Sequence, residues 1–346
     1  MARREDLQIS LEQVQAIIDK HRPSDPPPKI SVFHKITDES FSSLTTTQSY
    51  VARTTEGPTY VLKAAPPPSS DPPTYVPNTL ALEHALVQKI VSLQGVPHPS
   101  PIAFDESGSI IPYHYLLSEH PAGISLAAVR TSKKLTDKQR LLLDLRIGSH
   151  FKRIHEEVQN DWFGLPSQEK DELYSWQEAF TYLLETVLHD VKELGEDLPY
   201  EEIRKCLSRA IGFFLFDDCE VPSLISFLGD EETITVAFDP SDPTENEEIP
   251  ITSLFSLSHA VWGDPLLETA FVNPSQAFLE GYGGSPIIFN RQKTKRMWYT
   301  LFQALVVLVQ SHRLQGAEAV AAKSQVEWAR NTVAQCVKDL KDAPCY

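Results

Sequence analysis

Three charged residues lie in segments where they could act on a transferred group. Lys63 is near the end of the strand-like run TYVLKAA, and Glu83 is in the helix-like run LALEHALVQKI. Their spacing suits a strand lysine that reaches a glutamate on the next helix, but an edge-strand lysine and a solvated helix face would give the same pattern. Asp230 lies in LGDEETITVAFD, which is either a site turn or an acidic hairpin turn. A lysine and an acid that orients a hydroxyl group would suit phosphoryl transfer.

The composition excludes several classes of ligand and location. The 346 residues carry a formal net charge of −16, and their basic residues form no long run, which argues against a nucleic-acid partner. The four cysteines are scattered without metal-ligand spacing. The start, MARREDLQIS, has no apolar stretch of a secretory signal, and the most apolar run, LFQALVVLV, is too short to span a bilayer. We therefore expect a cytoplasmic protein with no membrane partner.

The order of the expected elements changes near residue 120. Before it, strand-like runs and proline-rich turns dominate, with a leading helix after Ser10 and one inserted helix at 80–95. A proline-rich, exposed connector is expected at 65–77. After residue 120 the pattern is mostly helical, with a few short strands. This order predicts an α+β protein with a small N-lobe, residues 1–120, and a larger C-lobe, residues 121–346. A cleft between two lobes is a natural site for a small-molecule ligand.

Six segments together resemble the aminoglycoside phosphotransferase and choline-kinase-like branch of the protein-kinase-like fold, over roughly residues 8–310. TYVLKAA is similar to the third strand of that fold, and LALEHALVQKI to the helix after it. YHYLLSEHPAGISL resembles the hinge, and IGSHFKRIHEEVQNDWFG a later helix and its end. LGDEETITVAFD falls on the catalytic loop. ITSLFSLSHAVWGDPLLETAF falls on the metal-binding segment, and its part WGDPLLETA is the most specific string.

The resemblance implies roles for four residues. Lys63 would contact nucleotide phosphates, Glu83 would pair with Lys63, and Glu119 would lie at the hinge that holds the nucleotide. Asp230 would be the catalytic acid–base group, in the alignment that needs no gap. A second alignment, shifted by two residues, would instead put Leu228 where the acid belongs.

The same resemblance exposes a shortfall at the metal site. The asparagine position of the family's pattern is occupied by Thr235, and the aspartate position by Ser256. Magnesium needs anionic or strongly polar oxygen ligands in near-octahedral geometry, so two neutral hydroxyls leave it poorly held. In addition, the segment ITDESFSSLTTTQ, where the nucleotide-covering loop is expected, contains no glycine. Backbone amides there cannot approach phosphates as closely as in a glycine-rich turn.

Three functions remain open at this stage. The favoured hypothesis is a degenerate protein of this type, with an eroded Mg–ATP site, that binds a small molecule or catalyses a different reaction between the lobes. The alternative is an active ATP-dependent O-phosphotransferase for a small hydroxylated metabolite, with ATP and Mg²⁺ as cofactors. A third hypothesis is a scaffold whose helical lobe docks a protein partner. The sequence alone identifies neither ligand nor cofactor.

Overall fold

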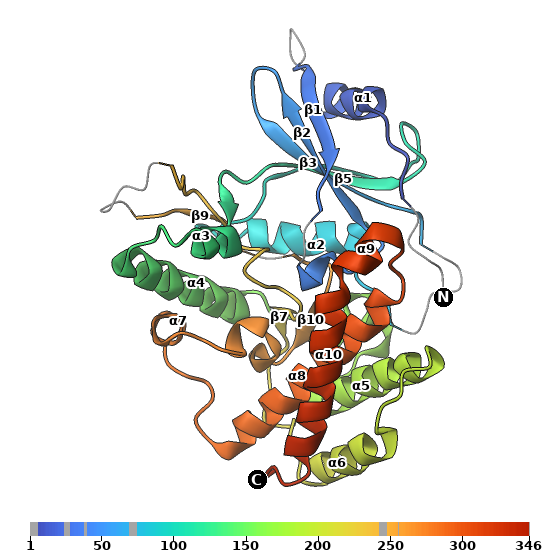
Figure 1. Cartoon of the computed structure of the whole chain (residues 1–346), viewed down its shortest axis with the longest axis vertical. Helices are drawn as coiled ribbons and strands as arrows, with labels where there is room; N and C mark the ends of the chain where they lie inside the picture. Colours follow the sequence, from blue (N-terminus) through green and yellow to red (C-terminus); the bar gives the residue numbers. More distant parts are fainter. Residues whose placement is uncertain are drawn as a thin grey trace.

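The N-terminal part is a five-stranded antiparallel sheet with a helix on each face (Figure 1). The computed structural model describes residues 6–23, 28–37, 40–68, 75–241, 248–254 and 256–345. In spatial order the strands are β1 (Ile30–Lys35), β2 (Gln48–Thr54), β3 (Thr59–Ala65), β5 (His114–Glu119) and β4 (Pro101–Asp105).

The alternation of side chains along β3 decides which face of the sheet each residue reaches. Leu62 and its even-numbered neighbours pack under α1 (Leu11–His21), which follows Ser10 as predicted and starts with a capping box of Ser10 and Gln13. The odd-numbered Lys63 therefore points to the opposite face, where α2 (Leu80–Val91) lies. The alternation of side chains along β3 thus places Lys63 on the same face as the helix that carries Glu83.

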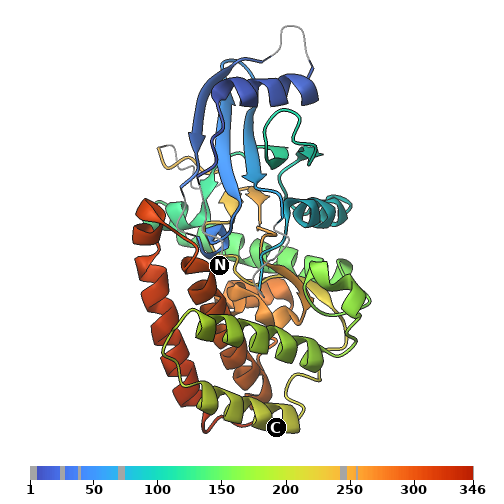
Figure 2. The same ribbon diagram turned by 90° about the vertical axis from the view of Figure 1, so that its right-hand side faces the viewer.

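The C-terminal part is mostly helical and is stacked below the sheet (Figure 2). Its core helix, α8 (Asn290–Ser311), is buried throughout the apolar run 301–309, as the sequence predicts. Among the described residues, no helix is both long and apolar enough to cross a membrane. The other helices are α3 (Leu126–Ser132), α4 (Asp137–Glu157), α5 (Trp176–Glu193), α6 (Tyr200–Gly212), α7 (Gln276–Tyr282), α9 (Gly316–Ala321) and α10 (Lys323–Leu340).

Two small sheets lie between the large sheet and the helices. One contains β6 (Ile124–Ser125), β8 (Thr235–Val236) and β9 (Ile251–Ser253), and the other contains β7 (Ser223–Ser226) and β10 (Ala260–Gly263). Gly123 makes the first sheet possible, because its φ is +109° and a Cβ there would lie 1.9 Å from the carbonyl oxygen of Val236. These short strands hold the turns that carry Asp230 and Ser256.

Two residues from the N-terminal part complete the core of the C-terminal helices. Leu44 follows the short helix η1 (Phe41–Ser43), and Tyr75 precedes α2; they are 3% and 0% exposed. The prediction of an exposed connector at 65–77 is therefore wrong at Tyr75, while residues 69–74 lie outside the described residues. The mixed architecture itself is the predicted α+β fold, with a strand-rich first part and a helical remainder.

Candidate functional site

Lys63 and Glu83 meet where β3 faces α2. The Nζ atom of Lys63 lies 2.7 Å from Oε2 of Glu83, whose side chain is buried. The other carboxylate oxygen of Glu83 accepts a hydrogen bond from the hydroxyl of Ser258 at 3.1 Å, and Ser258 contacts the hydroxyl of Ser256 at 2.9 Å. Glu83 therefore links the lysine of the sheet to the segment where a metal ligand is expected.

The carboxylate of Asp230 binds two backbone amides. Its Oδ2 accepts from the N–H of Phe41 at 2.9 Å, and its Oδ1 accepts from the N–H of Glu232 at 3.0 Å. The hydroxyl of Thr233 donates to the carbonyl oxygen of Asp230 at 2.7 Å. One carboxylate oxygen thus binds the local backbone, and the other binds a segment 189 residues away in the chain.

The segment 40–45 crosses from the sheet to the helices at this point. The ring of Phe41 packs on Trp328 of α10, with ring centroids 4.8 Å apart. Three residues later, Leu44 enters the helical core, and its carbonyl oxygen accepts a hydrogen bond from His259 at 3.3 Å. Three contacts, with Asp230, Trp328 and His259, therefore fix a segment that the sequence predicts to be the nucleotide-covering loop.

Two cavities lie on opposite sides of this segment. The first, of about 240 Å³, is the cleft between the sheet and the helices, and it is lined by Lys63, Ser256 and the side chains of Ser40 and Ser42. The second, of about 480 Å³, lies against α4, α7 and α10 and is lined by Phe41 and by Asp230. Because neighbouring residues of the segment line different cavities, the segment forms a wall between them.

The cleft does not fit a magnesium ion. Thr235 and Ser256 both line it, and the hydroxyl of Ser256 contacts the hydroxyl of Ser258. Within the described parts of the chain, no group of three or more His, Cys, Asp or Glu residues could hold a metal ion. Glu232 also lines the cleft, but one carboxylate with hydroxyls is a weak donor set for this hard cation. Asp264, farther along the same segment, caps the next turn by accepting from the N–H of Leu266.

Glu119 lies at the end of β5 but is not among the described residues that line the cleft. Its carboxylate pairs with Arg22, just after α1, and its backbone N–H donates to the carbonyl oxygen of Ser100 at 3.0 Å. The neighbouring Ser118 and Pro121 line the cleft instead. The structure therefore brings Lys63 to the cleft beside Glu83, and leaves Glu119 on the outer side of the hinge.

A buried histidine ties two N-terminal segments to the helices. His259 is fully buried, and burial lowers its pKa to about 3, so the imidazole is neutral. The carbonyl oxygen of Leu44 can only accept, so Nε2 of His259 carries the proton and donates to it. The Nδ1 atom must then accept from the hydroxyl of Tyr75, at 2.8 Å. His259 thus has a defined tautomer and two defined partners.

Tyr75 is held on its backbone as well. Its N–H donates to Asp190 at 2.8 Å, and its carbonyl oxygen accepts from Arg313 at 2.9 Å. Together with His259, these contacts fasten the chain just before α2 to the helical part. The lysine-bearing sheet is therefore attached to the helices through these contacts as well as through the hinge.

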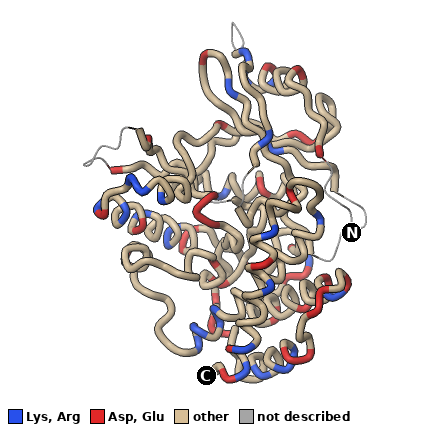
Figure 3. Tube along the Cα trace, viewed as in Figure 1, with Lys and Arg blue, Asp and Glu red and all other residues tan. Residues whose placement is uncertain are grey.

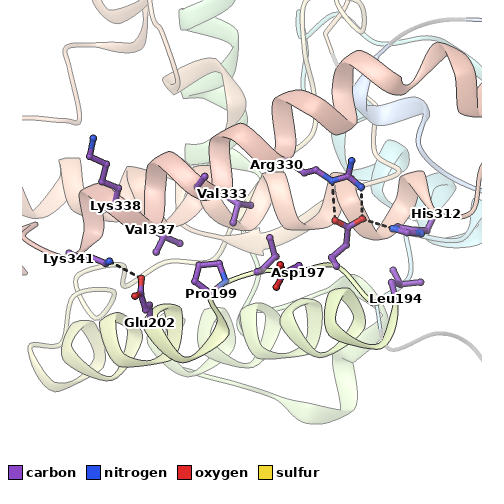
Figure 4. Close-up of a pocket in the computed structure, with 14 residues that line it drawn as sticks. Leu194, Asp197, Pro199, Glu202, His312, Arg330, Val333, Val337, Lys338 and Lys341 are labelled. Atoms are coloured by element: carbon purple, nitrogen blue, oxygen red, sulfur yellow. Dashed lines mark hydrogen bonds and ion pairs between the residues drawn. The ribbon is translucent and has the colours of Figure 1, made fainter.

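A third and larger cavity lies away from these residues. It is a groove of about 660 Å³ between the α5–α6 connection and α10 (Figure 4). Five of its side chains form ion pairs: Glu196 is 2.8 Å from Arg330 and 2.9 Å from His312, and Lys341 is 2.8 Å from Glu202. Elsewhere, Lys and Arg are distributed over the whole trace (Figure 3).

Comparisons with solved structures decide the fold. A Ralstonia eutropha protein named for the aminoglycoside phosphotransferases superposes with a TM-score of 0.61 at 14% identity, covering 97% of this chain and 100% of that one. The GDP complex of an aminoglycoside 2′-phosphotransferase gives 0.57 at 12% identity, with coverages of 96% and 99%. The chain has the aminoglycoside phosphotransferase fold. A microcompartment-associated aminopropanol kinase shares this fold, with a TM-score of 0.53, 13% identity and coverages of 97% and 100%. No family model and no curated protein matches the sequence.

Within this phosphotransferase fold, sequence reasoning missed the residues that build the wall. Phe41 lies inside the expected nucleotide-covering loop, but nothing in the sequence indicates its contact with Trp328, which is far away in the chain. One signal was present, however. The stretch 40–49 contains four serines and three threonines, and TSLFSLS at 252–258 contains three serines and a threonine. Both stretches contribute side chains to the cleft.

Proposed function

We propose that this protein is a degenerate relative of the phosphotransferases that no longer transfers phosphoryl groups and instead binds a small molecule between its two parts. The contact between Asp230 and Phe41 carries the proposal. In this arrangement the acid that would activate an acceptor hydroxyl serves as a backbone acceptor, and the segment it holds separates the two cavities. A phosphoryl donor in one cavity could not reach an acceptor in the other.

The chemistry of the cleft supports the same conclusion. Neutral hydroxyls at Thr235 and Ser256 give magnesium little to bind, and loss of the metal removes several kcal/mol of charge stabilisation from the transition state. Loss of a general acid–base group costs about 10²- to 10⁴-fold in rate, and the Asp230 carboxylate is engaged by two backbone amides. The cleft, at about 240 Å³, is also small for a nucleotide, since sites for drug-sized ligands have roughly 300–1,000 Å³.

A nucleotide-binding experiment tests this proposal. Thermal unfolding of the full chain is followed with ATP alone, with Mg²⁺ alone and with both, and ATP consumption is measured in parallel. We expect no stabilisation that needs both ligands together and no turnover. The Lys63→Met variant is the matched control, because it removes the cation that would contact phosphates. A magnesium-dependent rise in melting temperature that is lost in Lys63→Met would contradict the proposal.

The retained pair of Lys63 and Glu83 favours a second candidate, an active O-phosphotransferase for a small hydroxylated metabolite. Related folds include proteins named for aminoglycoside and aminopropanol phosphorylation, so an acceptor with hydroxyl and amino groups is the natural trial substrate. This candidate requires the wall to open. It predicts acceptor-dependent ATP consumption that disappears in Asp230→Ala, and unchanged consumption in that variant would exclude Asp230 as the acid–base group.

A further inference from the structure

The cleft has walls of an unusual chemical kind. Twelve of the eighteen residues that line it are serines or threonines. They come from three separate stretches: the segment 40–49 on the sheet side, Ser118 near the hinge, and the turns 233–258 on the helical side. Random loss of a nucleotide site would replace its residues by many types. Serine and threonine residues from separate stretches around one cavity instead indicate a common ligand chemistry.

The charge of the cleft argues against an anionic ligand. Lys63 and Glu232 are the charged residues among the described lining, and the ammonium of Lys63 already lies 2.7 Å from the carboxylate of Glu83. The local balance is therefore neutral to negative, because Lys63 is the one cationic side chain among the described residues that line the cleft. A neutral ligand matches this balance better.

Hydroxyl side chains suit a partner that both donates and accepts. Each serine or threonine hydroxyl offers one donor and two acceptor positions and can rotate to exchange them. The hydroxyls of Ser40 and Ser42 form a hydrogen bond of 3.0 Å, and those of Ser256 and Ser258 form one of 2.9 Å. In each pair the two serines are separated by one residue. A polyol presents the same alternating donors and acceptors. Between the hydroxyls, Val61 lines the cleft and offers apolar contact to C–H groups.

We infer that the cleft binds a small neutral polyol, either cyclic or open-chain. Its volume of about 240 Å³ equals that of about eight liquid waters, which is on the order of a six-carbon polyol. This inference rests on the proposed function, because ATP would have to occupy the same space.

Binding of defined probes tests the inference. Titration calorimetry of the full chain uses myo-inositol and glucose as neutral polyols, and inorganic phosphate and Mg–ATP as charged probes. Two single variants each remove one hydroxyl group from the cleft. Ser42→Ala changes the sheet side, and the isosteric Thr235→Val changes the helical side. The control is Thr55→Val, at an exposed position just after the far end of β2. Melting temperatures verify that each variant is folded.

We expect at least one polyol to bind, and each cleft variant to weaken it about five- to tenfold, the effect of one lost hydrogen bond. Thr55→Val should bind like the original protein. If Ser42→Ala fails to fold, Thr235→Val alone decides the matter. Absence of polyol binding, equal affinity in all variants, or tighter binding of phosphate would overturn the inference. ATP turnover would overturn the proposed function as well, whereas a missing polyol signal without turnover removes this inference alone.

Discussion

The buried imidazole of His259 makes the stability of the protein depend on pH in a way that can be calculated. Burial lowers its pKa from 6.5 to about 3, with the nearby charge of Arg313 acting in the same direction and the hydrogen bond to Leu44 opposing it. Between these two pKa values, the unfolded chain binds a proton at His259 and the folded chain does not. Folding stability from this residue therefore rises with pH across the window and is lost as the pH falls below 6.5.

The magnitude follows from the same two values. One pKa unit corresponds to about 1.4 kcal/mol, so acidification from about pH 7 to about pH 5 should remove about 2 kcal/mol of unfolding free energy through His259 alone. Protonation would also turn Nδ1 into a donor facing the hydroxyl of Tyr75, which would break their present hydrogen bond. A loss of this size is measurable against a typical total of about 5–15 kcal/mol.

Urea unfolding at both pH values measures this contribution. His259→Gln cannot titrate, so its stability should fall about 2 kcal/mol less on acidification than that of the original protein. His34→Gln is the control, because His34 is exposed on β1 and should leave the pH dependence unchanged. The carboxylates titrate in all three proteins and cancel in the differences. Parallel pH dependence of the original protein and His259→Gln would refute the buried, neutral assignment.

Three further predictions concern buried groups and close contacts in the core. Tyr75→Phe should lower the unfolding free energy by about 1–3 kcal/mol in urea titration, because it leaves Nδ1 of His259 buried without a partner. Gly281→Ala should lower the unfolding free energy by about 1–3 kcal/mol or more, which a lower melting temperature would report. Its Cβ would lie 1.8 Å from the carbonyl oxygen of Leu145, where α7 crosses α4. Burial raises the pKa of the Cys336 thiol to about 11, so iodoacetamide should label Cys336 slowly in the native protein and rapidly in urea.

The sequence was informative where local strings determine local geometry. The strand run around Lys63 and the helix run around Glu83 each have a clear period, and one strand-to-helix step brings the two side chains together. The capping box at Ser10 and the cap formed by Asp264 are equally local, because their partners lie two or three residues away. Such features depend on spacing along the chain, which a single sequence contains.

The wall could not be predicted for the opposite reason. The partner of Asp230 is the backbone N–H of Phe41, and any residue except proline could supply that group. The absence of glycine in 36–48 indicated poor phosphate binding, but not that Leu44 would be buried among the helices. The path of such a loop is set by contacts with Trp328 and His259, which are distant in the chain and carry no pattern of their own.

The burial of Leu44 and Tyr75 makes the two parts of the molecule a single cooperative unit. A fragment that starts at residue 121 would lack both side chains and would leave His259 without either of its hydrogen-bond partners. Melting of the sheet would likewise pull both side chains out of the helical core and open it to water. We expect amide exchange in β3 and in α8 to require the same opening event, so that neither part survives the loss of the other.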